Sequence, residues 1–141
     1  MNSHCHTLSN KIAIFLINNF FEIISQHSGE NKNQLHAEIR INKDHPVFSG
    51  HFPEQPVVPG VFMIQMIIEI LSDYLQEEVI LKELRNVKFL SFIDPGINQI
   101  LEVKLEITEE YQHSCHVTAV IAAGAQVFLK SKGLYQKISE N

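Results

Sequence analysis

The chain has 141 residues, enough for one domain with a substantial hydrophobic core and too few for two. Its hydrophobic content of 45% and charged content of 19% are those of an ordinary soluble globular protein. The formal net charge of −5 argues against nucleic acid as the main partner. Cys5 and Cys115 are the only cysteines and cannot form a disulfide framework, so we expect a reducing, cytoplasmic environment.

The N-terminal residues 1–19 are expected to be a tail or a short helix that precedes a single domain over residues 20–141. The apolar run Ile12–Ile17 ends at two asparagines and is too short for a signal peptide or a membrane-spanning segment. The cluster His4-Cys5-His6 contains metal-ligand side chains, but adjacent ligands in a terminal tail rarely form a metal site. We therefore expect neither a metal site nor a membrane anchor.

The first predicted elements of the domain form a β-hairpin. Phe20–Gln26 is apolar and β-compatible, and Ser28–Asn33 has the composition of a turn. From Leu35 to Ile41, apolar residues alternate with polar ones, and this period of two predicts a strand with one buried face.

A loop rich in proline and glycine follows the hairpin. Four of the five prolines and two of the six glycines lie between His45 and Gly60. Proline fixes φ and glycine permits close approach, so we expect a stiff, non-regular loop with His51 in its middle. The next segment, Val61–Gln76, has no Gly or Pro and predicts a helix of about four turns.

This predicted helix is apolar around most of its circumference, which requires that protein surround it. Its polar residues fall on one stripe, at spacings of four, three and four: Gln65, Glu69, Ser72 and Gln76. The stripe is either a narrow solvent-facing edge or a polar strip that lines a pocket or a subunit interface.

The last part of the domain, Val79–Ile138, has the pattern of long antiparallel strands. Apolar residues alternate with polar ones in two runs, Leu101–Ile107 and Val117–Ala123, and should face one core. Turn signals separate the strands at Asp94-Pro95-Gly96, at Thr108–Glu110 and at Gly124. The sequence thus predicts one buried helix against an antiparallel sheet.

The segment GHFPEQPVVPGV, Gly50–Val61, resembles the signature of the 3-hydroxyacyl-[acyl carrier protein] dehydratases of type II fatty acid synthesis. The upstream HPVF and the downstream Leu84–Gly96, LRNVKFLSFIDPG, also resemble segments of that family, and the resemblance covers roughly Phe20–Ile138. It implies an α+β hot-dog fold, an antiparallel β-sheet wrapped around one long central α-helix, and pairing with a second copy into a dimer.

Removal of water from a 3-hydroxyacyl thioester requires a base, stabilisation of an enolate and an acid for the departing hydroxyl. His51 suits the role of base, because imidazole titrates near neutrality. The backbone N–H of Gly60, at the positive end of the helix, can polarise the thioester carbonyl. By resemblance, the carbonyl of Val57 orients the imidazole. The chemistry requires no cofactor or metal.

The acid is where the chain departs from the family pattern. The resemblance places a Glu or Asp fourteen residues after the histidine, supplied by the other subunit, and often a Gln four residues later. Here Gln65 and Glu69 hold those positions, so the pair looks exchanged. An amide cannot supply a proton at neutral pH, and loss of general acid assistance costs about 10²–10⁴ in rate.

Three interpretations follow. In the first, Glu69, about 6 Å along the helix from Gln65, takes the acid role directly or through a water held by Gln65. In the second, the chain pairs with a related subunit that retains the acid. In the third, it is an acyl thioesterase or a non-catalytic acyl-binding subunit, because a fold alone does not decide chemistry. We expect a dehydratase first, because thioesterase hot-dog domains usually lack the His-Phe-Pro loop.

The expected partners are a thioester of acyl carrier protein or coenzyme A and a second hot-dog subunit, identical or related, within a dimer or a higher oligomer. Basic residues that recur every third position could dock an acidic carrier, or simply form a solvated strand face: Lys82, Arg85 and Lys88. Four other side chains could line an acyl tunnel, although such residues around a buried helix are often plain core: Phe48, Phe52, Phe62 and Met66.

Overall fold

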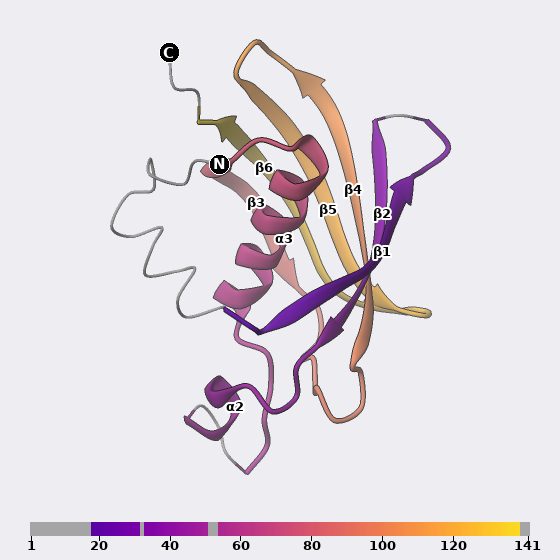
Figure 1. Ribbon diagram of the computed structural model, residues 1–141, viewed down its shortest axis with the longest axis vertical. Coiled ribbons are helices and arrows are strands. Elements are labelled where there is room, and N and C mark those ends of the chain that lie inside the picture. The colour runs from indigo at the N-terminus through magenta and orange to yellow at the C-terminus, as the bar shows by residue number, and fades with distance from the viewer. Residues whose placement is uncertain (1–17, 32, 51–53, 139–141) are drawn as a thin grey trace.

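The computed structural model describes residues 18–31, 33–50 and 54–138, which form one curved sheet around one long helix (Figure 1). The helix is α3, Gly60–Leu75. The strands of the sheet are β1 (Phe21–Ser28), β2 (Gln34–Ile41), β3 (Val79–Phe89), β4 (Ile100–Glu110), β5 (Ser114–Ala123) and β6 (Gln126–Lys137). This arrangement confirms the predicted α+β architecture. The expected N-terminal tail, with His4-Cys5-His6, lies outside the described residues, so it stays a prediction.

The six strands are paired antiparallel in the order β1-β2-β4-β5-β6-β3. The predicted hairpin is therefore β1 and β2, at one edge of the sheet. After β2 the chain leaves the sheet, forms α3 across one of its faces and returns as β3 at the opposite edge (Figure 1). As a result, the start of β3 follows the C-terminal end of α3, and the end of β3 lies near its N-terminal end.

The core lies between α3 and the sheet. The two predicted runs of alternation supply its floor, with Leu101, Val103, Val117 and Ile121 each no more than 1% exposed. The helix contributes its inner side to the same core, as Met66, Ile67, Ile70 and Leu71. Within the described residues, no helix is long and apolar enough to cross a membrane.

The predicted non-regular loop is wrong at its start, because Pro46–Gly50 forms a short helix, α2. Proline has the φ angle of a helix and needs no donor at the first helical position. The buried His45 caps this helix, since its Nδ1 accepts a hydrogen bond from the Val47 N–H at 3.0 Å. Its Nε2 lies 3.0 Å from the Asn18 carbonyl oxygen and donates to it, so both ring nitrogens are used.

The predicted turn at Thr108–Glu110 is also wrong. Strand β4 continues to Glu110, and the connection to β5 comes after it, closed by a 2.7 Å bond from the Tyr111 N–H to the Ser114 carbonyl. A register shift between Ile107 and Glu109 accommodates the irregular sequence inside the strand pair.

Candidate functional site

The candidate site begins at the N-terminal end of α3. Pro59 precedes the helix and provides no side-chain cap, while its carbonyl accepts hydrogen bonds from the N–H groups of Phe62 and Met63. Within the described part of the chain, the Gly60 N–H has no hydrogen-bond acceptor. Among the described residues, this end of the helix therefore presents an unbonded donor at the positive end of the helix dipole.

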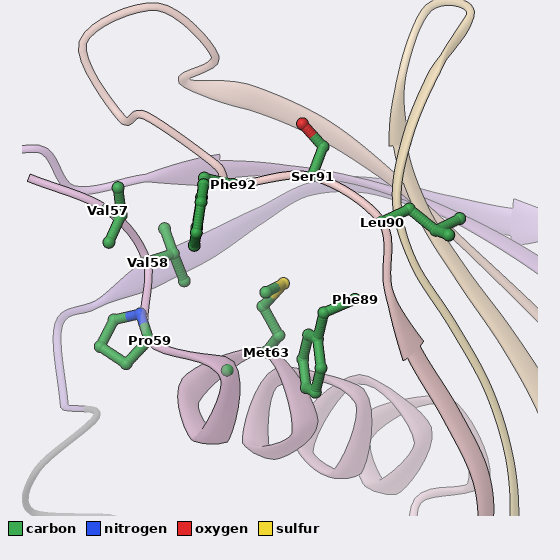
Figure 2. A pocket seen from close by; sticks show the side chains of 9 residues that line it. Val57, Val58, Pro59, Met63, Phe89, Leu90, Ser91 and Phe92 are labelled. Carbon is green, nitrogen blue, oxygen red and sulfur yellow. The ribbon is translucent and has the colours of Figure 1, made fainter.

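A pocket of about 340 Å³ lies beside this free donor (Figure 2). Figure 2 shows Phe92 on one side of it, Phe89 on the other and Met63 on the side of the helix. Two of its aromatic side chains are open to solvent, Phe89 at 51% and Phe92 at 79%. The lining is almost wholly apolar: Val57, Val58, Pro59, Gly60, Met63, Phe89, Leu90, Ser91 and Phe92.

Glycine at position 60 permits the close packing of this wall. A Cβ atom built on Gly60 would lie 3.0 Å from two carbons of the Phe89 ring. That distance is shorter than a normal carbon–carbon contact, so the ring packs directly on the backbone at the start of α3. The exposed ring thus forms one wall of the pocket next to the free Gly60 N–H.

Hydrogen bonds hold the two loops that form the pocket. The Val58 N–H donates to the Ile93 carbonyl at 3.0 Å and joins the loop before α3 to the segment after β3. The Leu90 N–H donates to the Phe128 carbonyl at 2.8 Å, and Gln126 Nε2 donates to Ser91 Oγ at 2.9 Å. The pocket therefore has a fixed backbone frame, although its side chains are exposed.

The predicted site residues divide among three places. Gly60 and Val57 both line the pocket, so the structure brings together the two predicted backbone groups. His51 and Phe52 lie outside the described residues, and their roles stay predictions. Gln65 and Glu69 lie elsewhere on α3.

The Gln65–Glu69 pair lies on the side of α3 that is turned away from the core. Gln65 Nε2 donates to Glu69 Oε2 at 3.2 Å, and both side chains are partly buried. Burial raises the pKa of Glu69 above its usual range, and the hydrogen bond from Gln65 opposes this shift without cancelling it. The carboxyl therefore holds a proton more firmly than an exposed glutamate does.

The helix phase separates this pair from the pocket of the same chain. Glu69 is nine positions after Gly60 in α3, which is a net rotation of about 180° around the helix axis at roughly 100° per residue. Glu69 therefore points away from the side on which the Gly60 N–H and Phe89 meet. Glu69 is accordingly not among the residues that line the pocket of its own chain.

The other predicted acyl-binding residues belong to the core. Phe48 and Phe62 pack against Phe20, with ring centroids 5.6 Å and 4.8 Å away, and Met66 is fully buried. None of these three lines the pocket at the start of α3. A role in acyl binding stays a prediction for them, and it would require the core to open.

Sequence reasoning missed the wall formed by Phe89, Leu90, Ser91 and Phe92. A signal was present, because the adjacent apolar residues Phe89 and Leu90 break the period of two at the end of β3. Cys115 is buried in the core. The described residues contain no group of three or more His, Cys, Asp or Glu side chains able to hold a metal ion.

Comparison with known proteins agrees with this fold and sequence. The 3-hydroxyacyl-[acyl-carrier-protein] dehydratase FabZ of Rickettsia massiliae (strain Mtu5) is 24% identical over 100 residues, which cover 65% of this chain and 68% of that protein. The dehydratase heterocomplex ApeI:P from Xenorhabdus doucetiae aligns with a TM-score of 0.64 at 21% identity, over 82% of this chain and 96% of that one.

A hypothetical thioesterase with coenzyme A from Streptococcus pneumoniae TIGR4 aligns with a TM-score of 0.58 at 14% identity, over 92% of this chain and 96% of that one. These structural likenesses confirm the predicted hot-dog fold. A family model described as ApeI-like, ApeI dehydratase, matches residues 26–126, well over half of the chain. The chain therefore belongs to the ApeI-like dehydratase family.

Proposed function

We propose that the chain removes water from 3-hydroxyacyl thioesters to give trans-2-enoyl thioesters, in the synthesis of fatty acids or of related lipids or polyenes. The observation that carries the proposal is the Gln65–Glu69 pair. It places a partly buried carboxyl with a raised pKa one helical turn from the position where the resemblance puts the acid. A carboxyl that stays protonated closer to neutral pH is the group that a departing hydroxide requires.

Each residue then has one task. His51 takes the proton from C2, while the Gly60 N–H donates to the thioester carbonyl and stabilises the enolate. Glu69 gives its proton to the hydroxyl at C3, the C3–O bond breaks and water leaves as the C2–C3 double bond forms. The amide of Gln65 holds the carboxyl in place through the 3.2 Å hydrogen bond.

The complete site requires two subunits. The net rotation of about 180° between Gly60 and Glu69 supports a site in which one subunit supplies His51, Gly60 and the pocket, and the other supplies Glu69. The exposed apolar wall at Phe89 and Phe92 supports an interface beside the pocket, because soluble proteins seldom leave such a surface uncovered. The second subunit is another copy of the chain or a related hot-dog protein.

The experiment is mass spectrometry of a 3-hydroxyacyl-acyl carrier protein incubated with the purified chain alone. We expect the wild type to produce a loss of water, and both His51→Ala and Glu69→Gln to abolish it. Gln65→Glu is the informative third variant. If the wild type is inert and Gln65→Glu gains dehydration, Glu69 is not the acid and a partner subunit supplies it.

Thioester hydrolysis is the second candidate function, since a thioesterase with coenzyme A shares the fold over most of this chain. Hydrolysis requires a water at the carbonyl carbon and no acid at C3. The same spectra detect it as loss of the acyl group from the carrier, and that product without any loss of water would replace the proposed function.

A further inference from the structure

The face of the sheet that points away from α3 carries a group of exposed lysines at one edge. On β6, the exposed Lys130 and Lys132 alternate with the buried Ser131 and Gly133, so both lysines lie on this outer face. Lys88 of β3 is the register partner of Lys130. The two strands at this edge of the sheet therefore bring three exposed lysines together.

Arg85 joins them at a shallow groove on the same face. A groove of about 230 Å³ is lined by Arg85, Thr108, His116, Val117, Thr118, Lys132 and Gly133, which come from β3, β4, β5 and β6. We call Arg85, Lys88, Lys130 and Lys132 the basic strip.

Few carboxylates neutralise the positive charges of the basic strip. Arg85 Nε contacts Glu83 Oε1 at 3.2 Å, whereas the three lysines form no ion pair with any carboxylate whose side chain the structure describes. On the opposite half of the same face, Glu38 of β2 is the register partner of Glu102 of β4, and the exposed Arg40 and Lys104 lie there too. In a chain of net charge −5, the strip is thus a local excess of positive charge.

The strip borders the pocket. Lys88 is the residue before Phe89, which forms the pocket wall, and Phe89 is the register partner of Leu129, the neighbour of Lys130. A partner on the strip would therefore lie next to the mouth of the pocket, around the edge of β3.

We propose that the basic strip docks an acidic carrier protein that delivers the acyl thioester; this rests on the proposed function. The spacing of the charges favours a protein surface over the phosphates of coenzyme A. Lys130 and Lys132 are about 7 Å apart along the strand, and all three lysines are exposed, flexible point charges. Such a row matches separated carboxylates on a protein, whereas a phosphate group is bound by donors that converge on one point.

The first measurement is binding of an acidic carrier protein without any acyl group, by fluorescence anisotropy at several salt concentrations. We expect the affinity to fall with salt and to fall by about tenfold or more in the double variant Lys130→Glu/Lys132→Glu. The matched control is Lys104→Glu, an exposed lysine of β4 that lies two strands from Lys130 on the same face and outside the strip, which should change the affinity far less.

The second measurement uses two substrates, a carrier-linked 3-hydroxyacyl thioester and its small N-acetylcysteamine analogue. The double variant should raise KM for the carrier-linked substrate and leave turnover of the analogue unchanged. Equal losses in Lys130→Glu/Lys132→Glu and Lys104→Glu, or equal losses on both substrates, would overturn the docking site. If the wild type dehydrates neither substrate, the proposed function fails, while the anisotropy still decides the docking site.

Discussion

The two ends of helix α3 are built in opposite ways. At the C-terminal end, the N–H groups of Gln76 and Glu77 bond to the carbonyls of Asp73 and Ser72, and the Ser72 hydroxyl accepts from the Val79 N–H. At the N-terminal end, Pro59 provides no side-chain cap and the Gly60 N–H has no acceptor among the described residues. One end is closed by its own chain and the other is left open beside a pocket.

This difference supports the proposed location of the active site at the N-terminal end of α3. Free donors and exposed aromatic side chains lower stability unless something covers them. The closed end uses polar residues to fix the helix, as in the bond from Gln26 of β1 to Asp73. In the proposed function, the open end keeps Gly60, Phe89 and Phe92 available for a ligand and a second subunit. The following changes test this contrast, from the largest expected effect to the smallest.

Glu69→Gln should lower the rate of dehydration by about 10²–10⁴, the usual contribution of a general acid. The amide keeps the shape of the side chain and can still accept the hydrogen bond from Gln65. Asp73→Asn is the matched control, because Asp73 is an acid one turn further along the helix that bonds to Gln26. The measurement is the rate of enoyl formation, and equal rates for Glu69→Gln and the wild type would remove Glu69 from the mechanism.

Gly60→Ala should destabilise the fold by about 1–3 kcal/mol, because the added methyl group overlaps the Phe89 ring. Activity should fall too, since the ring moves and the pocket changes shape. The control is Gly50→Ala, where a Cβ meets no atom within 4 Å. Urea denaturation measures the free energy of unfolding of the two variants. Similar values for Gly60→Ala and Gly50→Ala would show that the close Gly60–Phe89 contact does not limit the side chain at position 60.

Glu69→Gln should also stabilise the fold at neutral pH while it removes activity. Burial raises the pKa of Glu69, so the folded state binds its proton more tightly than the unfolded state does. The stability that this carboxyl contributes is complete below its unfolded pKa and is lost as the pH rises through its folded pKa. Thermal unfolding from pH 4 to pH 8 should therefore show that Glu69→Gln loses less stability with rising pH than the wild type does. A lower stability of the variant at neutral pH contradicts this account.

Gln76→Gly should raise stability by about 0.5–1 kcal/mol without a change in activity, because Gln76 ends α3 with a φ of 55°, where glycine has no steric penalty. The gain is limited by the loss of the Gln76 side-chain bond to the Asp73 carbonyl. Gln76→Ala keeps the unfavourable φ and loses the bond, so it should be the least stable of the three. A change in turnover in either variant would contradict the view that this end is only structural.

Much of the fold followed from local patterns. The alternation from Leu35 to Ile41 and from Leu101 to Ile107 predicted strands correctly, and the uninterrupted apolar segment gave α3 to within one residue. The two wrong predictions, at α2 and at the end of β4, came from local backbone geometry that the periodicity of the sequence does not reveal. A proline at a helix start and a histidine cap produced α2, and a register shift extended β4 past its expected turn.

The candidate site was only partly predictable. Gly60, Val57, Gln65 and Glu69 were predicted from their motif and spacing, and their roles stay predictions. The pocket that Gly60 and Val57 line is formed by two segments that meet only in the folded chain. The pairing of Lys88 with Lys130 likewise depends on strand register, which one sequence does not fix.

A complementation assay tests the central claim most directly, that the pocket of one subunit uses Glu69 of another. His51→Ala and Glu69→Gln chains, each inactive alone, are unfolded together, refolded as a mixture and assayed for dehydration. If the chain forms homodimers, half of the dimers are mixed and each holds one intact site, so we predict about a quarter of the wild-type activity. A mixture as inactive as its components would show that His51 and Glu69 act within one chain, or that Glu69 is not the acid.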